Sequence, residues 1–127
     1  MRLMRFFVFV ICVSSVVAQE EVGLIVAESV FATIQVDGDI SDWAGIEPAY
    51  IDTIGDSSGS DFDFAAAYIA NDNEFLYIRI SFAEDVPFGE KAFLVNLAFN
   101  TDLDPSTGFG FAGVTGSEFF IQSGNVY

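Results

Sequence analysis

The sequence predicts an all-β protein, an antiparallel β-sandwich of jelly-roll type that is incomplete at its C-terminal end. Two observations predict this fold class. Runs rich in Phe, Val, Ile and Tyr recur along the chain between clusters of Gly, Asp, Asn and Ser, and no stretch has the period of a long helix. The chain has 127 residues, 52% of them hydrophobic. That content is enough to bury the core of one domain in spite of a strongly acidic charge.

The N-terminal segment has the pattern of a secretory signal peptide. Arg2 and Arg5 form a basic start, an apolar run follows, and small residues precede Gln19. We therefore expect a mature chain that is secreted to the periplasm, the cell surface or the extracellular space and is not inserted in a membrane. The expected division is a cleaved signal, a lead-in segment and a β-domain, at residues 1–18, 19–32 and 33–127.

Removal of the signal makes the chain more acidic. Arg2 and Arg5 leave with it, so two basic residues remain against 19 acidic ones, a net charge of −17. A surface of this charge repels nucleic acid and anionic lipid, so neither is expected as a partner. Cys12 also lies within the signal, and the mature chain therefore has no disulfide.

The first half of the β-domain begins with a strand over residues 31–36, which ends at an Asp-Gly-Asp turn. A single helical turn is expected next, with Ser41 as its cap and Gly45 as its exit. A short strand at 49–53 and a polar, acidic loop at 55–61 complete this half.

A β-hairpin is the strongest local signal in the sequence. Residues 62–70 and 75–82 flank the turn sequence Asn-Asp-Asn-Glu at 71–74. Alternate residues of the second arm form an apolar face expected in the core: Leu76, Ile78, Ile80 and Phe82. The opposite face carries Tyr77 and Arg79, and we interpret it as either partly wet or ligand-binding.

The second half predicts further strands at 92–100 and 117–122, separated by an acidic loop and a Gly-rich passage. A last strand begins at Val126. Because so short a strand leaves the edge of its neighbour unpaired, we expect the sequence to be a fragment of a longer protein with appended domains.

Five of these motifs, in this order and spacing, resemble the family-9-like carbohydrate-binding modules, a branch of the DOMON-like β-sandwiches. The motifs include Val-Asp-Gly-Asp-Ile-Ser-Asp-Trp and Asn-Thr-Asp-Leu-Asp-Pro-Ser-Thr-Gly, and they lie at 36–43, 69–72, 76–79, 100–108 and 116–122. The resemblance implies an antiparallel sandwich, often appended to larger secreted or cell-surface bacterial proteins. It also implies calcium and sugar binding in some members, and it does not imply catalysis.

The acidic loop that starts at Asn100 is the candidate calcium site. Asp102 and Asp104 stand two residues apart among turn residues, and Asn100, Thr107 or backbone carbonyls complete a shell of oxygens, with Glu118 as a further ligand. The alternative is an ordinary turn in which these side chains cap backbone amides. Repulsion between the two carboxylates favours the ion, which would remove it.

Aromatic and guanidinium side chains are the candidates for sugar binding. Trp43, the only Trp, is either a stacking platform or a core plug, and the core role is favoured because buried aromatic residues are the commoner kind. Tyr50, Tyr68 and Tyr77 are alternative platforms. Arg79 either hydrogen-bonds sugar hydroxyls or pairs with a carboxylate.

Common catalytic and redox sites are excluded by composition. The chain has no His, and Cys12 leaves with the signal, so Ser-His and Cys-His catalysis and His-based zinc sites are not available. Met1 and Met4 leave as well, so neither usual haem ligand remains. A glycosidase would need two facing carboxylates in one cleft, and no motif indicates such a pair.

These arguments lead to one main hypothesis about function. The chain is a non-catalytic extracellular carbohydrate-binding module that is stabilised by calcium, binds a polysaccharide or glycan, and holds neither zinc nor haem. The alternative is a structural or adhesive calcium-stabilised β-module without a sugar ligand.

Overall fold

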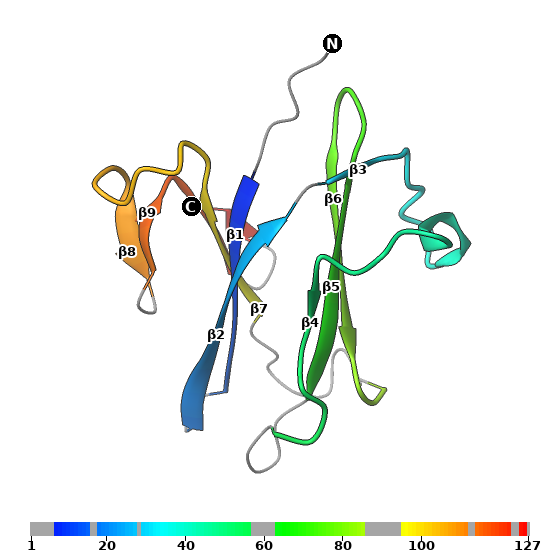
Figure 1. Cartoon of the computed structure of the whole chain (residues 1–127), viewed down its shortest axis with the longest axis horizontal. Coiled ribbons are helices and arrows are strands. Elements are labelled where there is room, and N and C mark those ends of the chain that lie inside the picture. The colour runs from blue at the N-terminus through cyan, green and yellow to red at the C-terminus, as the bar shows by residue number, and fades with distance from the viewer. Residues whose placement is uncertain are drawn as a thin grey trace.

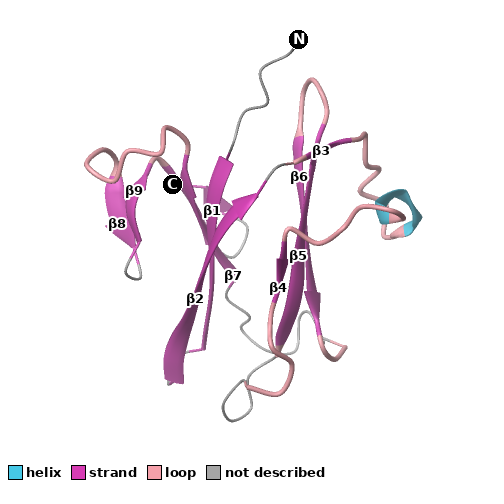
Figure 2. Cartoon of the chain, viewed as in Figure 1, coloured by secondary structure: helices cyan, strands magenta, loops and turns pink. Residues whose placement is uncertain are grey.

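The structure, a computed structural model, is all-β over the residues that it describes, with one short helical turn among them (Figure 2). It describes residues 7–15, 18–27, 29–56, 63–85, 95–111, 114–122 and 125–126, and side chains over 29–56, 63–85, 96–110 and 115–121. The elements within these ranges are β1 (Phe7–Ser15), β2 (Ala18–Ala27), β3 (Val30–Phe31), the 3-10 helix η1 (Ser41–Trp43), β4 (Tyr50–Ile51), β5 (Phe64–Asn71), β6 (Leu76–Phe82), β7 (Val95–Asn100), β8 (Phe109–Phe111), β9 (Val114–Ser117), β10 (Phe119–Gln122) and β11 (Asn125–Val126).

The described strands form three sheets. A five-stranded sheet has the order β11-β10-β7-β1-β2, a second sheet has the order β3-β5-β4 with β6 also paired to β5, and β8 and β9 form a two-stranded sheet. The two larger sheets lie side by side, with the β8–β9 pair and η1 at opposite ends of the molecule (Figure 1). Within the described part, no helix is long and apolar enough to cross a bilayer.

The segment expected in the signal peptide forms β1 in the uncleaved chain. Strand β1 lies between β2 and β7, pairing Phe9 with Ile25 on one side and with Phe99 on the other. A run of apolar, β-branched residues suits the hydrophobic part of a signal and a central strand equally well, because both environments exclude water. Cleavage after residue 18 would remove β1 and separate β2 from β7. The cleavage itself stays a prediction.

The β5–β6 hairpin is confirmed. Asn71 pairs with Leu76 and Ile69 with Ile78, in antiparallel register. The turn is held by Asp72, whose Oδ1 accepts the backbone N–H groups of Glu74 and Phe75, each at 2.8 Å. An Asp at this position supplies an acceptor for the backbone N–H donors that a tight turn leaves unsatisfied.

Two local expectations are corrected. The helical turn is a 3-10 helix preceded by Ile40 with no side-chain cap, so Ser41 is its first residue and not its cap. Asp39 accepts the N–H of Ser41 instead, at 2.9 Å. Strand β3 is only two residues long and pairs with β5 in parallel, so the structure is not purely antiparallel. Parallel pairing follows from the approach of the chain, which enters alongside the C-terminal end of β5.

Three other strands are confirmed with narrower bounds, and one pair was not expected. Strands β4, β7 and β10 fall within the runs predicted at 49–53, 92–100 and 117–122. The Gly-rich passage after the acidic loop, for which no strand was predicted, contributes β8 and β9, with Phe109 opposite Ser117. Aromatic residues spaced by glycine still alternate between two faces, which is sufficient for a short strand pair.

Apolar side chains cover both faces of the β5–β6 hairpin. One cluster joins Phe64, Ala67 and Ile69 of β5 to Phe99 of β7, and thus contains residues of both larger sheets. The other cluster joins Ala70 to residues of the segment that contains η1, which are Ile34, Trp43 and Ile46. The face interpreted as either partly wet or ligand-binding is partly covered by the 32–46 segment, and Tyr68, Tyr77 and Arg79 on it are half-buried.

Candidate functional site

The acidic loop connects β7 to β8 and is shaped by its own side chains. Asn100 Oδ1 accepts the N–H of Leu103 at 2.6 Å, and Asp102 Oδ1 accepts the N–H of Asp104 at 2.9 Å. Leu103 has a positive φ of 63°, which an L residue adopts only under such constraint. The amide-capping contacts that the turn interpretation predicts are therefore present, and they bend the loop back on itself.

The hydroxyl of Thr107 lies at a point where four acceptor oxygens converge. Its Oγ1 is 3.2 and 3.0 Å from the two carboxylate oxygens of Asp102, 3.0 Å from the carbonyl oxygen of Asp104 and 3.1 Å from Oε1 of Glu118. A hydroxyl has a single proton to donate. One hydrogen atom thus faces four acceptors that belong to two carboxylates and a carbonyl, which is an excess of oxygen over donors.

Glu118 reaches this point from the bend between β9 and β10. Its Oε2 accepts the N–H of Thr101 at 2.7 Å and the hydroxyl of Thr101 at 3.1 Å, while its own N–H donates to the carbonyl of Phe99 at 2.8 Å. These contacts fix both ends of the side chain against the start of the loop. Glu118, a secondary candidate in the sequence, is therefore a central residue of the arrangement.

Asp104 faces away from the convergence point. Its Oδ1 accepts the hydroxyl and the N–H of Ser106, at 2.6 and 2.9 Å, and these hydrogen bonds lower the pKa of the Asp104 carboxyl below its ordinary value. Only its backbone carbonyl contacts Thr107. Among the side chains the structure describes, no three acidic, His or Cys residues are grouped to hold a metal. The arrangement instead combines Asp102 and Glu118 with a carbonyl and a hydroxyl.

Two glycines allow the neighbouring strands to approach the loop. Gly116 has a φ of +83°, and a Cβ placed on it would lie 2.5 Å from the carbonyl oxygen of Asp104 and 2.6 Å from Nδ2 of Asn100. A Cβ on Gly108 would collide with the backbone of Ser117. Ser117 is fully buried, and its hydroxyl has no hydrogen-bond partner in the structure. The residues thus form a tight, oxygen-rich cradle, which fits a hard cation such as calcium.

The structure separates Trp43 from solvent. Only 8% of Trp43 is exposed, and its ring meets Tyr68 edge-on at a centroid distance of 6.2 Å. Tyr77 packs against the same cluster. Of the two interpretations of Trp43, its burial supports the core plug, because a sugar would need a ring face that is open to water.

Arg79 and Tyr68 lie opposite each other on neighbouring strands. The guanidinium carbon of Arg79 is 4.5 Å from the centroid of the Tyr68 ring, a cation–π contact. Among the described side chains, no ion pair joins Arg79 to a carboxylate. In the described part of the chain, the partner of the guanidinium is thus an aromatic ring and not a carboxylate, and this contact with the ring face does not use the guanidinium N–H groups.

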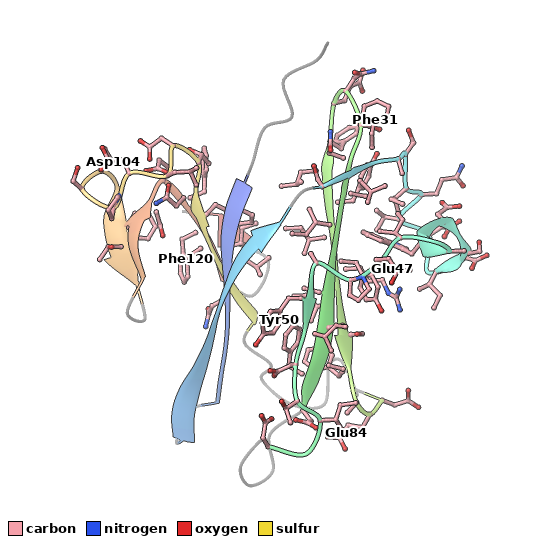
Figure 3. All side chains as sticks on the ribbon, viewed as in Figure 1. Phe31, Glu47, Tyr50, Glu84, Asp104 and Phe120 are labelled. Carbon is pink, nitrogen blue, oxygen red and sulfur yellow. The ribbon has the colours of Figure 1, made fainter. Side chains whose placement is uncertain are left out.

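Tyr50 belongs to the core cluster shared by the two larger sheets. Its ring stacks on Phe64 at 5.8 Å with an interplanar angle of 12°, and its hydroxyl donates to Asp52 Oδ1 at 3.1 Å. Figure 3 shows Tyr50 on β4, far from Asp104 in the acidic loop. The candidate sugar residues are therefore brought together only in part. Trp43, Tyr68, Tyr77 and Arg79 share one face, and Tyr50 is on the other.

The hydrogen bond between Tyr77 and Asp72 makes the hairpin pH-sensitive at two extremes. The Tyr77 hydroxyl donates to Asp72 Oδ2 at 2.8 Å. The backbone N–H groups of Glu74 and Phe75, and then the hydroxyl of Tyr77, donate hydrogen bonds to Asp72 and lower the pKa of its carboxyl. The hydrogen bond that Tyr77 donates to Asp72 raises the pKa of the Tyr77 hydroxyl.

A depressed Asp pKa stabilises the fold above about pH 4, and this contribution is lost as pH falls through the folded-state pKa. A raised Tyr pKa stabilises below about pH 10, and that contribution is lost as pH rises further. Tyr77→Phe is therefore expected to reduce both pH dependences, measured as urea midpoints between pH 3 and 11. An unchanged alkaline limb would contradict this assignment.

Comparison of the chain with protein-family models, with curated proteins and with solved structures finds no match.

Proposed function

We propose that this chain is a non-catalytic, extracellular β-sandwich module whose acidic loop binds calcium. The observation that carries the proposal is the convergence of Asp102, Glu118 and the carbonyl of Asp104 on the hydroxyl of Thr107. Calcium accepts carboxylate, carbonyl and hydroxyl oxygens together, in irregular geometry. The core cluster with residues from both larger sheets supports the sandwich arrangement, and the N-terminal pattern supports export.

Electrostatics explain why a cation would matter to the fold. Asp102 and Glu118 each lie close to the same hydroxyl, so their nearest oxygens are at most about 6 Å apart. Two carboxylates at that separation repel by roughly 1 kcal/mol in water. A divalent ion between them would turn this repulsion into attraction and hold β7, the loop and the β9–β10 bend together. The role would be mechanical, since the chain has no His and offers no recognised catalytic pair.

Calcium is expected to stabilise the protein, and the loop carboxylates are expected to be required for it. At a concentration one hundred times its dissociation constant, calcium would add about 2.7 kcal/mol, which for a domain of this size raises Tm by roughly 10 °C. The measurement is Tm with calcium and with EDTA, for the full chain and for Asp102→Asn and Glu118→Gln.

Asp37→Asn is the matched control for charge. Asp37 is an exposed residue that caps the N–H of Asp39 in a similar turn, so its substitution removes one negative charge without touching the loop. We expect this variant to keep the full calcium response. Equal responses in all four proteins would overturn the proposal.

A second candidate function, sugar binding, is favoured by the contact between Arg79 and Tyr68. Both side chains are half-buried, and the stacked guanidinium keeps donors for hydroxyl groups beside an aromatic ring. This is the chemistry of many protein–sugar contacts, in which stacking and hydrogen bonding act together. The same melting experiment separates the candidates. A sugar-binding module would be stabilised by an oligosaccharide and retarded in gels that contain the polysaccharide, whereas a structural module would respond to calcium alone.

A further inference from the structure

Acidic residues also gather at one end of the second sheet, away from the loop after β7. Strands β4 and β6 are both antiparallel to β5, so the segments that follow β4 and β6 lie beside the segment that precedes β5. Glu84 marks this end in Figure 3, where it is far from Asp104. The described acidic residues in these three segments are Asp52, Asp56, Asp63, Glu84 and Asp85.

Asp63 differs from the others because it is buried. Only 8% of the residue is exposed. Its Oδ2 accepts the N–H of Gly55 at 2.6 Å, and its carbonyl accepts the N–H of Ala83 at 2.9 Å, so the backbone holds it from both neighbouring segments. Its Oδ1 is buried and has no hydrogen-bond partner in the structure. A carboxylate oxygen that is fixed, buried and unpaired costs free energy until a hydrogen-bond donor or a cation satisfies it.

The described side chains do not supply that partner. Arg79 is positioned over the ring of Tyr68, and no ion pair involves Asp63 in the described part of the chain. The N–H of Asp52 donates to the carbonyl of Ala65 at 2.9 Å, which places Asp52 beside the start of β5. Its Oδ1 accepts the hydroxyl of Tyr50, which leaves its Oδ2 as a second carboxylate oxygen at the same sheet end. Among the side chains described at this sheet end, oxygen is thus the ligand chemistry offered, with neither nitrogen nor sulfur, and hard divalent cations prefer it.

We propose that this end of the sheet binds a second divalent cation of the calcium class, with Asp63 Oδ1 as the inner ligand and Asp52 as its partner. Since no three acidic side chains converge among the described residues, carbonyl oxygens and water complete the shell. The exposed acids Asp56, Glu84 and Asp85 raise the local negative potential and so favour cation entry. The site would tie β4, β5 and β6 together independently of the loop after β7.

Calcium titration of the EDTA-treated full chain by isothermal calorimetry tests the proposal. We expect two bound ions per chain, one of which is lost in Asp63→Asn and the other in Glu118→Gln. Asparagine keeps an acceptor for the N–H of Gly55, so the fold is expected to survive, which circular dichroism checks. Asp85→Asn is the control, because it removes the same charge from an exposed residue at the same end. Affinity should fall at least about tenfold in Asp63→Asn and little in Asp85→Asn.

Terbium luminescence gives a readout that does not depend on a variant of Asp63. Terbium replaces calcium and emits when a nearby Tyr is excited, and the Tyr50 hydroxyl touches Asp52. Tyr50→Phe should therefore remove part of the sensitised emission, and calorimetric titration of the same variant shows how many ions it still binds. Emission that is insensitive to Tyr50→Phe, or two ions still bound at full affinity in Asp63→Asn, would overturn the second site. The calcium response of Glu118→Gln would still test the first calcium site, in the loop after β7.

Discussion

Replacing Trp43 with alanine is expected to lower the free energy of unfolding by about 3–5 kcal/mol, the largest single-residue effect that the structure predicts. The indole is 8% exposed and lies in a cluster with Ile34, Ile46 and Ala70. Ala70 is fully buried, and its small side chain cannot fill the space that the indole would leave. Truncation would leave a cavity between the hairpin and the segment that covers it. The lower free energy of unfolding would appear as a lower urea midpoint.

Ile40→Ala is the matched control for this prediction. Ile40 immediately precedes η1 and is 60% exposed, so its truncation should change stability by no more than about 0.5 kcal/mol. The experiment also discriminates the two interpretations of Trp43. A variant of unchanged stability that loses affinity for a polysaccharide would make Trp43 a stacking platform and contradict the core assignment.

Gly116→Ala is expected to be the second most damaging substitution, at about 2–4 kcal/mol. The new Cβ would have to displace the carbonyl of Asp104 and the amide of Asn100, both held in the loop, and it would do so on a backbone with a φ of +83°. The displaced carbonyl is one of the oxygens around Thr107. The calcium-dependent rise in Tm should therefore shrink along with the stability in EDTA.

Gly38→Ala separates backbone conformation from crowding. Gly38 also has a positive φ, +93°, but no heavy atom lies within 4 Å of a Cβ built there. Its substitution should cost only the strain of a positive φ, roughly 1 kcal/mol, and leave the calcium response intact. If the two variants behaved alike, the close approach of Gly116 to the loop would have no energetic importance.

Local signals in the sequence identified the elements whose structure depends on neighbouring residues. The hairpin was predictable because strand-forming runs flank a turn in which Asp72 satisfies two backbone amides. The Gly45 exit of the helical turn was predictable for a similar reason, as its φ of +83° is costly for other residues. The absence of a side-chain cap was not predictable, since Ser41 has a suitable side chain and only the path of the chain makes it the first residue of η1, with its N–H donated to Asp39.

Contacts between segments distant in sequence decided the candidate sites. The sequence indicated an oxygen-rich loop at 100–108 but not that Asp104 would face Ser106 while Glu118 reaches Thr107 from another strand. Likewise, Asp63 lay in the run predicted as the first arm of the hairpin, next to the acidic loop, and nothing in the sequence singled it out as a buried acid. The direction of a side chain depends on strand pairing, which no short window of sequence specifies.

The amino-acid sequence by itself determined that this protein is built of strands and turns, that it is strongly acidic, and that its oxygen-bearing side chains are concentrated in loops. These properties follow from the composition and periodicity of short segments. Only the tertiary structure decided which faces are buried, that Trp43 covers the hairpin, and which oxygens meet across strands. The burial of a face and the meeting of oxygens across strands depend on pairs of segments that are distant in sequence. Both arise only when the two segments pack together and exclude water from between them.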